Sequence, residues 1–492
     1  MILTLNDPSL LRSDAFIAGE WSGADSGAFF DVYNPADGSL ISTVPGLTEI
    51  ETNRAVEAAY SAFRMWRCET ADYRARVLER WYELIISAED DLAAILCAEQ
   101  GKPLTEARDE IAYGASFVKW FAEEAKRAYG DMIPAPSADK RLMVLKQPVG
   151  VVGAITPWNF PVAMITRKAA PAMAAGCSII LKPAEETPLS ALALAVLAER
   201  AGVPKGVLSV VPCTRQNAPE IGKELTQNPK VRKLSFTGST EVGKLLAVQS
   251  AVNVQKISLE LGGNAPFIVF QDADLDAAVE GAIQAKFRNM GQTCVCANRF
   301  LVHADIAERF ERELIKRVST LSVGPGIDEN IDQGPLINSA AVDKVEALIS
   351  FALENGAEIA CGGRRHSLGG TYFEPTVLRG VDRDMQIVRE EIFGPVIAIQ
   401  TFKTDQEVVE LANDTEYGLA AYFFSRDISR IWPIAEALET GMIGINTGAI
   451  STAAAPFGGI KQSGLGREGS KYGLDEYLEV KYLALGGLAS GT

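Results

Sequence analysis

A cysteine follows a short polar turn in the stretch Gly291-Gln292-Thr293-Cys294. Residues 275–289 before it are predicted to form an amphipathic helix, and Phe300-Leu301-Val302 after it an apolar strand. A cysteine at such a junction can present its sulfur at the mouth of a cleft, where nearby Arg288 helps to hold the charge of the nucleophilic thiolate. The alternative is that Cys294 is one more small buried residue, as most free cysteines are.

Two other stretches offer the groups that a cysteine nucleophile needs. In Leu259-Glu260-Leu261-Gly262-Gly263 a lone carboxylate ends an apolar strand, where desolvation would raise the pKa of Glu260 and make it a usable general base. A structural ion pair would leave the same pattern. In Thr156-Pro157-Trp158-Asn159-Phe160-Pro161, the two prolines restrict Asn159, whose amide can then donate to an oxyanion. A turn with a buried aromatic side chain is the alternative there.

Two strand ends carry weak signals for a nucleotide. Strand 233–236 runs into Gly238 and Ser239, and free N–H groups at the start of the next helix favour a phosphate. A simple helix cap explains the same residues. Strand 178–181 is followed by Lys182 and Glu185, which can reach the ribose of an adenosine, although a solvated loop is the plainer interpretation. The motif Gly-x-Gly-x-x-Gly follows none of the predicted strands.

The composition excludes several classes of protein. The chain of 492 residues has only two histidines, His303 and His366, so a Cys-His hydrolase or a histidine-ligated metal centre is hard to build, and we expect no metal. Seven scattered cysteines give no disulfide framework and favour a reducing cytosol. A net charge of −16 argues against nucleic acid and anionic membranes as partners. We find no apolar run long enough to span a bilayer and no signal peptide.

Apolar periodicity predicts an α/β fold. Residues 48–127 have the spacing of consecutive helices, and residues 141–147 and 476–485 are predicted strands that can pair as an arm. Five apolar strands separated by helices predict a doubly wound parallel sheet, and a second βα series follows. The five strands are residues 151–155, 178–181, 207–211, 233–236 and 257–261; the second series runs through 267–270, 396–402, 420–424 and 442–445.

Taken together, these stretches resemble the aldehyde dehydrogenase superfamily over essentially the whole chain. The matching motifs are Pro157-Trp158-Asn159-Phe160-Pro161, Leu259-Glu260-Leu261-Gly262-Gly263, Gly291-Gln292-Thr293-Cys294, Glu391-Ile392-Phe393-Gly394-Pro395 and Pro456-Phe457-Gly458-Gly459. The succinate-semialdehyde dehydrogenase branch is closest in appearance, through Lys286-Phe287-Arg288-Asn289, residues 294–299 and residues 464–473.

The resemblance implies a mechanism and a set of site residues. Cys294 would attack the aldehyde carbon, Glu260 would activate the water that hydrolyses the thioester, and Asn159 with the Cys294 N–H would hold the oxyanion. The implied cofactor residues are Trp158, Lys182, Glu185, Gly238, Ser239, Leu261, Glu391 and Phe393. Arg167, Arg288 and Ser451 would grip a distal carboxylate, so succinate semialdehyde is the expected substrate and glutarate semialdehyde the nearest rival.

The family fold implies two doubly wound parallel-sheet domains and a small bridging sheet. We expect an NAD-binding domain at 1–130 and 148–261, a catalytic domain at 262–460, and a bridging arm at 131–147 and 461–492, assembled into a homodimer or homotetramer. A carboxylate at Glu185 would repel a 2′-phosphate, so NAD is expected over NADP. The longer loop 212–217 departs from the family pattern and makes the adenine end less certain.

Cys296 suggests a redox switch, because branch members resembling this chain use such a Cys-x-Cys pair. A disulfide from Cys294 to Cys296 would shield the nucleophile from irreversible oxidation. Packing of Cys296 as a small buried residue is the alternative. Two functions of other classes also stay open at this point: a cofactor-independent cysteine esterase and a structural, crystallin-like protein.

Overall fold

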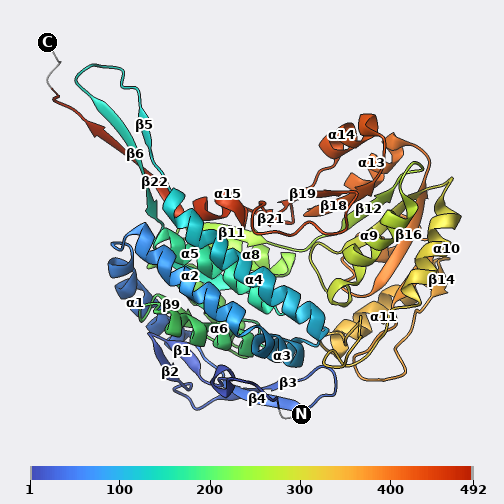
Figure 1. Ribbon diagram of the computed structural model, residues 1–492, viewed down its shortest axis with the longest axis horizontal. Coiled ribbons are helices and arrows are strands. Elements are labelled where there is room, and N and C mark those ends of the chain that lie inside the picture. The colour runs from blue at the N-terminus through green and yellow to red at the C-terminus, as the bar shows by residue number, and fades with distance from the viewer. Residues whose placement is uncertain (1–2, 489–492) are drawn as a thin grey trace.

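The computed structural model describes residues 3–488 and shows two lobes with a thin arm projecting from the first (Figure 1). The chain begins with two short hairpins, and the second hairpin lies at the bottom of the view in Figure 1. Their strands are β1 (Ala15–Ile17), β2 (Glu20–Ser22), β3 (Phe29–Tyr33) and β4 (Leu40–Pro45).

Four helices then cover the first lobe, as the periodicity of residues 48–127 predicted. The apolar residues of α1 recur every three or four positions, so Ala55, Ala59 and Phe63 all face inward and are buried. A capping box between Thr48 and Glu51 starts this helix. The four are α1 (Glu49–Trp66), α2 (Ala71–Ser87), α3 (Glu89–Gln100) and α4 (Leu104–Glu124).

The first lobe is built on an eight-stranded sheet with the order β2-β1-β9-β8-β7-β10-β11-β21. Its five central strands are parallel and are joined by helical crossovers, which confirms the predicted doubly wound sheet. These strands are β7 (Val151–Ile155), β8 (Ser178–Lys182), β9 (Leu208–Val210), β10 (Val231–Thr237) and β11 (Lys256–Glu260); the crossovers are α5 (Pro161–Ala175), α6 (Pro188–Ala201), α7 (Ala218–Gln227) and α8 (Thr240–Ala251).

The second lobe holds a seven-stranded sheet with the order β14-β15-β16-β13-β12-β18-β19, parallel except at β14. Its strands are β12 (Ala265–Val269), β13 (Ala297–His303), β14 (Glu358–Cys361), β15 (Thr376–Arg379), β16 (Val396–Phe402), β18 (Ala420–Phe424) and β19 (Met442–Ile445). Its helices are α9 (Leu275–Phe287), α10 (Ala307–Val318), α11 (Ser339–Glu354), α12 (Gln386–Arg389), α13 (Asp405–Asn413) and α14 (Ile428–Ala437), and β17 (Tyr417–Gly418) pairs with β20 (Ile460–Lys461).

The arm is a three-stranded antiparallel sheet of β5 (Asp131–Ile133), β6 (Arg141–Pro148) and β22 (Leu478–Leu485). Leu485 lies opposite Arg141, so the pairing expected from the sequence is confirmed. Part of the range 461–492 lies elsewhere: β21 (Gly464–Leu465) extends the first sheet beside β11, and α15 (Ser470–Asp475) packs against α5. We therefore propose that the arm proper begins at β22.

Two buried carboxylates of the helical cover cap the helices that follow β7 and β8. Glu99 accepts the N–H groups of Leu189 and Ser190, each at 2.8 Å, at the start of α6. Glu110 accepts the N–H groups of Val162 and Ala163 at the start of α5. Each carboxylate satisfies donors that a helix leaves unpaired in its first turn.

Thr187 stands at the N-cap of α6, before Pro188, but does not cap the helix with its side chain. Its side chain makes no capping hydrogen bond, and its hydroxyl is buried without a partner in residues 3–488. Glu99, which is 88 positions earlier in the chain, has taken the place of a local cap, a contact that only tertiary packing creates.

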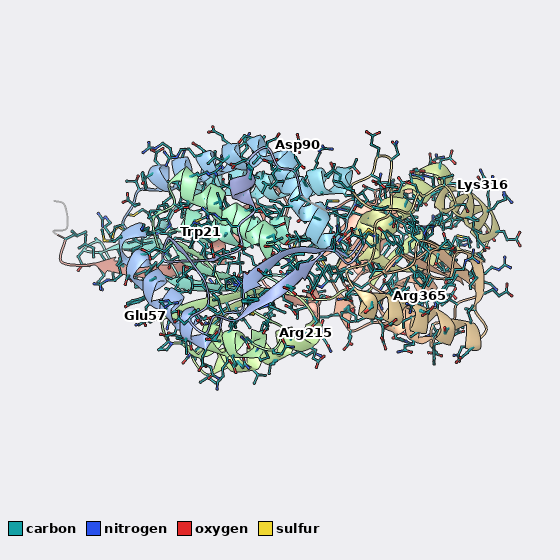
Figure 2. The ribbon with its side chains drawn as sticks, turned by 90° about the horizontal axis from the view of Figure 1, so that it is seen from below. Trp21, Glu57, Asp90, Arg215, Lys316 and Arg365 are labelled. Carbon is teal, nitrogen blue, oxygen red and sulfur yellow. The ribbon has the colours of Figure 1, made fainter. Side chains whose placement is uncertain are left out.

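Charged side chains are spread over the outside of both lobes. Figure 2 shows Glu57 and Asp90 projecting from the first lobe and Lys316 and Arg365 from the second, and all four are exposed. Among residues 3–488, none of the helices is both long and apolar enough to cross a membrane. The same residues contain no cluster of three or more histidine, cysteine or acidic side chains that could hold a metal ion.

Candidate active site

The catalytic turn begins where α9 ends at Phe287, two residues earlier than the sequence predicted. Asn289 and Met290 have left-handed backbones, with φ of 51° and 55°, which end the helix abruptly. Glu106 accepts the N–H of Asn289 at 2.8 Å, and Gln100 donates to the Asn289 side chain at 3.0 Å. The strained turn is therefore held by helices of the other lobe.

Two glycines let the backbone pack closely around Cys294. A Cβ at Gly263 would lie 2.5 Å from the carbonyl oxygen of Cys294, and one at Gly291 would lie 2.2 Å from that of Gly394. Gly291 also has a φ of +75°. The glycines of the two sequence motifs thus bring the strand end after Glu260 and the segment after Phe393 against the cysteine turn.

Asn159 is held through its side-chain amide and through its backbone carbonyl. Its side-chain Nδ2 donates to the Gln292 carbonyl at 3.0 Å, which uses one of its two N–H donors. Its own carbonyl accepts from Lys102 and from Asn289, both at 2.9 Å. Lys102 is completely buried and paired with Glu110, the residue that caps α5. The amide is thereby held beside the cysteine turn.

Glu260 lies buried at the end of β11, as expected for a general base. Burial raises the pKa of its carboxyl to about 7, although the neighbouring Arg167 lowers it. Oε2 accepts a hydrogen bond from Arg167, and Oε1 has no partner among the described residues. The expected raised pKa is confirmed, and the ion pair that was its alternative is also present.

The two cysteines of the turn face different surroundings. Cys294 is half-buried, and its pKa is raised well above the usual value by desolvation and by Glu260, with Arg167 opposing them. The cation that lowers the pKa of Cys294 is thus Arg167, whereas the sequence suggested Arg288. Cys296 is buried, and its thiol donates to the carbonyl of Lys286 at 3.4 Å.

Two cavities adjoin the cysteine turn. The first, named here the Glu260 cavity, has a volume of about 390 Å³ and is lined by Glu260 and Cys294. The second, the Arg288 cavity, has about 460 Å³ and is lined by Thr293 and Val295, the residues on either side of Cys294. Cys294 itself lines the first cavity, and its two chain neighbours line the second.

The Glu260 cavity brings together most residues that the resemblance assigned to a dinucleotide. It is lined by Trp158, Asn159, Gly238, Ser239, Leu261, Glu391 and Phe393. Ser239 is the N-cap of α8, so N–H groups of the first turn face this side. The ring of Trp158 meets that of Phe393 edge-on, with centroids 5.6 Å apart. Burial raises the pKa of Glu391 to about 7, and its carboxylate accepts from Gly263 N–H at 3.1 Å.

Lys182 and Glu185 lie at the end of β8, away from the Glu260 cavity. Their charged groups are 3.6 Å apart, and Glu185 lines a separate cavity of about 320 Å³ with Thr214 and Arg215. The loop 212–217 therefore borders the same cavity as Glu185, through Thr214 and Arg215. A shaped, partly polar site exists at this strand end, and its chemistry fits the hydroxyls of a ribose.

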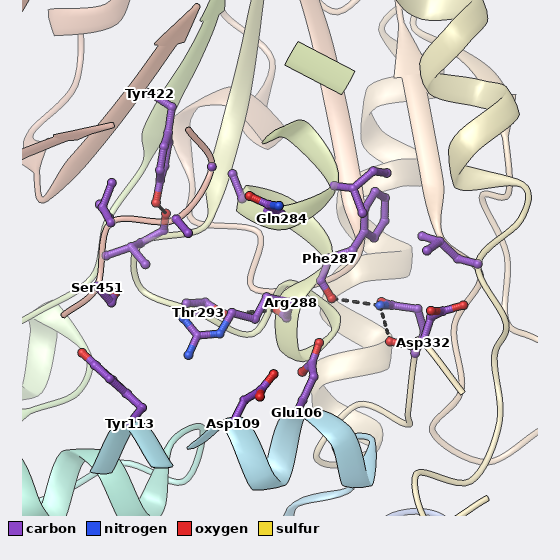
Figure 3. Close-up of a pocket in the computed structure, with 18 of the residues that line it drawn as sticks. Glu106, Asp109, Tyr113, Gln284, Phe287, Arg288, Thr293, Asp332, Tyr422 and Ser451 are labelled. Atoms are coloured by element: carbon purple, nitrogen blue, oxygen red, sulfur yellow. Dashed lines mark hydrogen bonds between the residues drawn. The ribbon is translucent and has the colours of Figure 1, made fainter. Parts of the chain in front are cut away.

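The Arg288 cavity joins Arg288 with Ser451, as the resemblance implied (Figure 3). Figure 3 also shows Tyr113 of α4 with its ring reaching up from the opposite wall. The Tyr113 hydroxyl is buried and has no hydrogen-bond partner in residues 3–488. The Arg288 guanidinium packs over the ring of Phe160 at 4.7 Å. A cation and two hydroxyls thus surround a space beside the nucleophile.

Arg167 is not in that space, although the resemblance placed it with Arg288 and Ser451. It is 1% exposed, does not line the Arg288 cavity, and is paired with Glu260 and Glu468. The fold brings its guanidinium to the base instead, because α5 turns this residue toward the end of β11. No role was predicted from the sequence for Tyr113, Lys168 and Glu468, although Glu468 lies within the matching stretch 464–473.

A family model described as the aldehyde dehydrogenase family matches residues 21–483. The chain is 59% identical to a 3-sulfolactaldehyde dehydrogenase of Pseudomonas putida, over 99% of this chain and 100% of that protein. It is 57% identical to the NADP(+) succinate-semialdehyde dehydrogenase of Escherichia coli, over 98% and 100%. A glutarate-semialdehyde dehydrogenase of Pseudomonas aeruginosa is 56% identical, over 99% and 100%.

A solved structure agrees with these relatives. The structure of a succinate-semialdehyde dehydrogenase from Burkholderia pseudomallei is similar with a TM-score of 0.97 and 60% sequence identity, covering 98% of this chain and 100% of that one. The matching model spans most of the chain, and the cysteine, the carboxylate and the two cavities lie together at its centre. The chain therefore belongs to the aldehyde dehydrogenase family.

Proposed function

We propose that this aldehyde dehydrogenase oxidises succinate semialdehyde to succinate with NAD. The observation that carries the proposal is that Cys294 lines a cavity suited to a dinucleotide, while its neighbours Thr293 and Val295 line a second cavity that carries Arg288. A substrate that enters from the Arg288 side places its aldehyde at the sulfur and its far end against a cation.

The proposed chemistry begins with attack of the Cys294 thiolate on the aldehyde carbon. The oxyanion that forms is held by the second N–H of Asn159 and by the Cys294 N–H. A nicotinamide dinucleotide bound in the Glu260 cavity supplies the acceptor for the hydride, which leaves a thioester on Cys294. Glu260 then takes a proton from water, and the hydroxide attacks the thioester and releases the carboxylic acid.

Because the pKa of Cys294 is raised, its thiol must lose its proton to solvent before the thiolate can attack the aldehyde. Desolvation by burial opposes the thiolate until a substrate or cofactor changes the surroundings of the sulfur. We propose that Glu391 would accept hydrogen bonds from a ribose of a bound dinucleotide. Trp158, Phe393 and Leu261 supply apolar walls of the Glu260 cavity.

The distal carboxylate is proposed to bind Arg288, Ser451 and Tyr113. Arg288 offers a planar fork, which suits a carboxylate, and the unpartnered Tyr113 hydroxyl gains an acceptor when an anion binds. The relatives reported above are named for aldehydes that end in a carboxylate or a sulfonate. Glutarate semialdehyde is the nearest rival, because one methylene changes selectivity by only about 1–3 kcal/mol.

A panel of aldehydes tests the proposal. Purified protein is given succinate semialdehyde, glutarate semialdehyde, 3-sulfolactaldehyde and butanal with NAD, and reduced cofactor is followed by absorbance. We expect kcat/KM to be highest for succinate semialdehyde and at least about tenfold lower for butanal, which lacks an anion. Equal values for butanal and succinate semialdehyde would refute an anion receptor, and no reduction of NAD or NADP with any of the four would refute the oxidation itself.

The preference for NAD rests on Glu185. A carboxylate that accepts from a ribose hydroxyl repels a 2′-phosphate, and Glu185 is only 3.6 Å from its one partner, Lys182. We expect Glu185→Ser to raise kcat/KM for NADP relative to NAD by at least about tenfold, because the repulsion disappears. Initial rates with both cofactors measure the ratio. A wild-type enzyme that already prefers NADP, as the named relative of Escherichia coli suggests, would contradict the assignment.

We also propose that Cys296 captures oxidised Cys294 as a disulfide. The Cys296 thiol points to the Lys286 carbonyl in this structure, so the side chain must turn before the bond can form. Peroxide should inactivate the wild type, and dithiothreitol should then restore its full activity. After the same treatment, Cys296→Ala should not recover fully. If both proteins recover to the same extent, Cys296 is not required for protection of Cys294.

A further inference from the structure

Arg167, in the middle of α5, is held between two carboxylates. Its Nη2 donates to Oε2 of Glu260, and its Nε lies 2.5 Å from Oε2 of Glu468. The face of its guanidinium is covered by the ring of Phe457 at 4.2 Å. Glu260 and Glu468 lie about 200 positions apart in the chain and meet at this one cation. The remaining nitrogen, Nη1, is buried and has no hydrogen-bond partner in residues 3–488.

The same network continues to Lys168 and Thr237. Lys168 donates to Glu468 and, at 2.6 Å, to the Thr237 hydroxyl, which lies 3.4 Å from Oε2 of Glu260. All of these contacts reach Glu260 through Oε2. Its other oxygen, Oε1, is buried, has no partner in residues 3–488, and belongs to a residue that lines the cavity with Cys294. One oxygen is therefore held and the other is left for chemistry.

We propose that Arg167 is a positioning residue for the catalytic base: it holds Oε2 of Glu260 and so directs Oε1 to the water that attacks the thioester on Cys294. This role rests on the proposed function. In the step itself, Oε1 takes one proton from water, the water oxygen bonds to the acyl carbon, and the carbon–sulfur bond breaks to return the Cys294 thiolate. The acid leaves, and the proton on Glu260 is later released, so no oxidant or reductant is involved.

Charge makes the same proposal testable by pH. Glu260 is a base only when ionised, and the groups that face it are Arg167 and Lys168 from α5, Glu468 from the segment after β21, Tyr113 from α4 and Cys294. Burial is the largest influence and raises its pKa to about 7; Arg167 lowers it and Glu468 raises it. Loss of Arg167 must therefore move the pKa up, and neutralisation of Glu468 must move it down.

An ester substrate isolates this step from the cofactor and from the distal carboxylate. p-Nitrophenyl acetate acylates Cys294 directly, and the acetyl enzyme is then hydrolysed with Glu260 as base. The pH dependence of deacylation is measured for the wild type, Arg167→Met, Arg167→Lys and Glu468→Gln. Arg312→Ala, which removes one exposed cation outside the site, is the control for the change in net charge. Butanal oxidation with NAD is measured in parallel.

We expect Arg167→Met to shift the acid limb of deacylation up by about one pH unit and to lower the plateau by about tenfold. Glu468→Gln should shift the limb in the opposite direction, and Arg167→Lys should lie near the wild type in pH while losing part of the rate. Butanal should lose kcat as succinate semialdehyde does. If the acid limb of Arg167→Met stays at the wild-type pH and only the KM for succinate semialdehyde rises, the proposal is overturned. Arg167 would then be a substrate-binding residue.

Failure of the proposed function has a different signature. If Glu260→Gln deacylates as fast as the wild type, Glu260 is not the base, and the function of the whole site is wrong. If Glu260→Gln is slow and Arg167→Met is not, only the role of Arg167 is wrong. Should Arg167→Met fail to fold, Arg167→Lys and Glu468→Gln decide the matter: an unchanged deacylation rate in Arg167→Lys, or an acid limb that moves up in Glu468→Gln, overturns the proposal.

Discussion

At the scale of single residues, the site depends on a few polar atoms that the fold leaves without partners. Oε1 of Glu260 and the hydroxyl of Tyr113 are both buried and unpaired in residues 3–488. Leaving a buried polar atom unpaired costs about 1–3 kcal/mol, so such atoms mark places where a substrate or water completes the bonding. We propose that Arg288 adds the charge that selects the substrate.

The Tyr113 hydroxyl and Arg288 should act on the anionic end of the substrate alone. We expect Arg288→Ala to raise the KM for succinate semialdehyde by at least about a hundredfold and Tyr113→Phe by about tenfold, because a charged hydrogen bond is worth more than a neutral one. Initial rates with succinate semialdehyde and butanal measure both. The KM for butanal should stay within about threefold of the wild type.

Arg312→Ala is the matched control, because Arg312 is exposed on α10 and outside the cavity. Parallel increases in KM for the two aldehydes in Arg288→Ala would mean that the arginine shapes the cavity rather than binds an anion.

At the scale of helices and strands, the site is positioned by helix starts that are capped from a distance. The α5 and α6 starts follow adjacent strands, and both begin with proline, which leaves their second and third N–H groups to find acceptors. Glu110 and Glu99, on the helical cover, supply these acceptors. The cover thereby fixes the segments that carry Asn159 and Glu185.

Glu99→Ala should destabilise the protein much more than a change at Thr187. Removal of the carboxylate leaves two buried N–H groups unpaired, so we expect the free energy of unfolding to fall by about 2–4 kcal/mol. Thr187→Val removes a buried hydroxyl that has no partner and should change stability by less than about 0.5 kcal/mol. Urea unfolding followed by circular dichroism measures both variants. A larger loss in Thr187→Val than in Glu99→Ala would mean that Thr187, rather than Glu99, caps α6.

Strands and most of the site could be predicted because their signals are local. The apolar runs at residues 151–155, 396–402 and 420–424 match β7, β16 and β18 residue for residue, since strands buried on both faces are continuous apolar runs. Glu260 and Cys294 stand beside glycines that mark close backbone approach. Glu99, Tyr113 and Glu468 could not be predicted, because each acts across more than 80 positions of chain, where spacing carries no information.

Arg167 shows the limit of a resemblance. Its motif matched a branch in which the corresponding arginine meets the substrate, yet the side chain here is paired with the base. Sequence spacing places a residue on a helix; the partner of a buried charge is set by which carboxylates the rest of the fold brings within reach.

At the scale of the whole molecule, two apolar surfaces are exposed and have no partner within residues 3–488. One lies on α8, where Leu245, Val248 and Val252 recur at helical spacing and are 53%, 71% and 73% exposed. The other lies on the arm, where Met132, Val480 and Tyr482 are exposed. The arm extends well beyond the first lobe (Figure 1). We propose that a second copy of the chain covers these surfaces.

Val248→Asp should therefore weaken assembly, because a buried unpaired charge is costly at an interface. We expect light scattering to give a dimer or tetramer for the wild type and a smaller species for Val248→Asp at micromolar concentration. Val254→Asp, in the exposed turn after α8, is the control for added charge. A monomeric wild type at the same concentration would contradict the proposed interface.

The central claim is that oxidation passes through a thioester on Cys294 that Glu260 removes. Glu260→Gln keeps the nucleophile and loses the base, so the acyl group should accumulate when succinate semialdehyde and NAD are added. Peptide mass spectrometry after acid quenching measures it on residues 289–299. We predict one burst of reduced cofactor per active site and a succinyl group on Cys294, which hydroxylamine removes. Steady turnover by Glu260→Gln at the wild-type rate, with an unmodified Cys294 peptide, would contradict the claim.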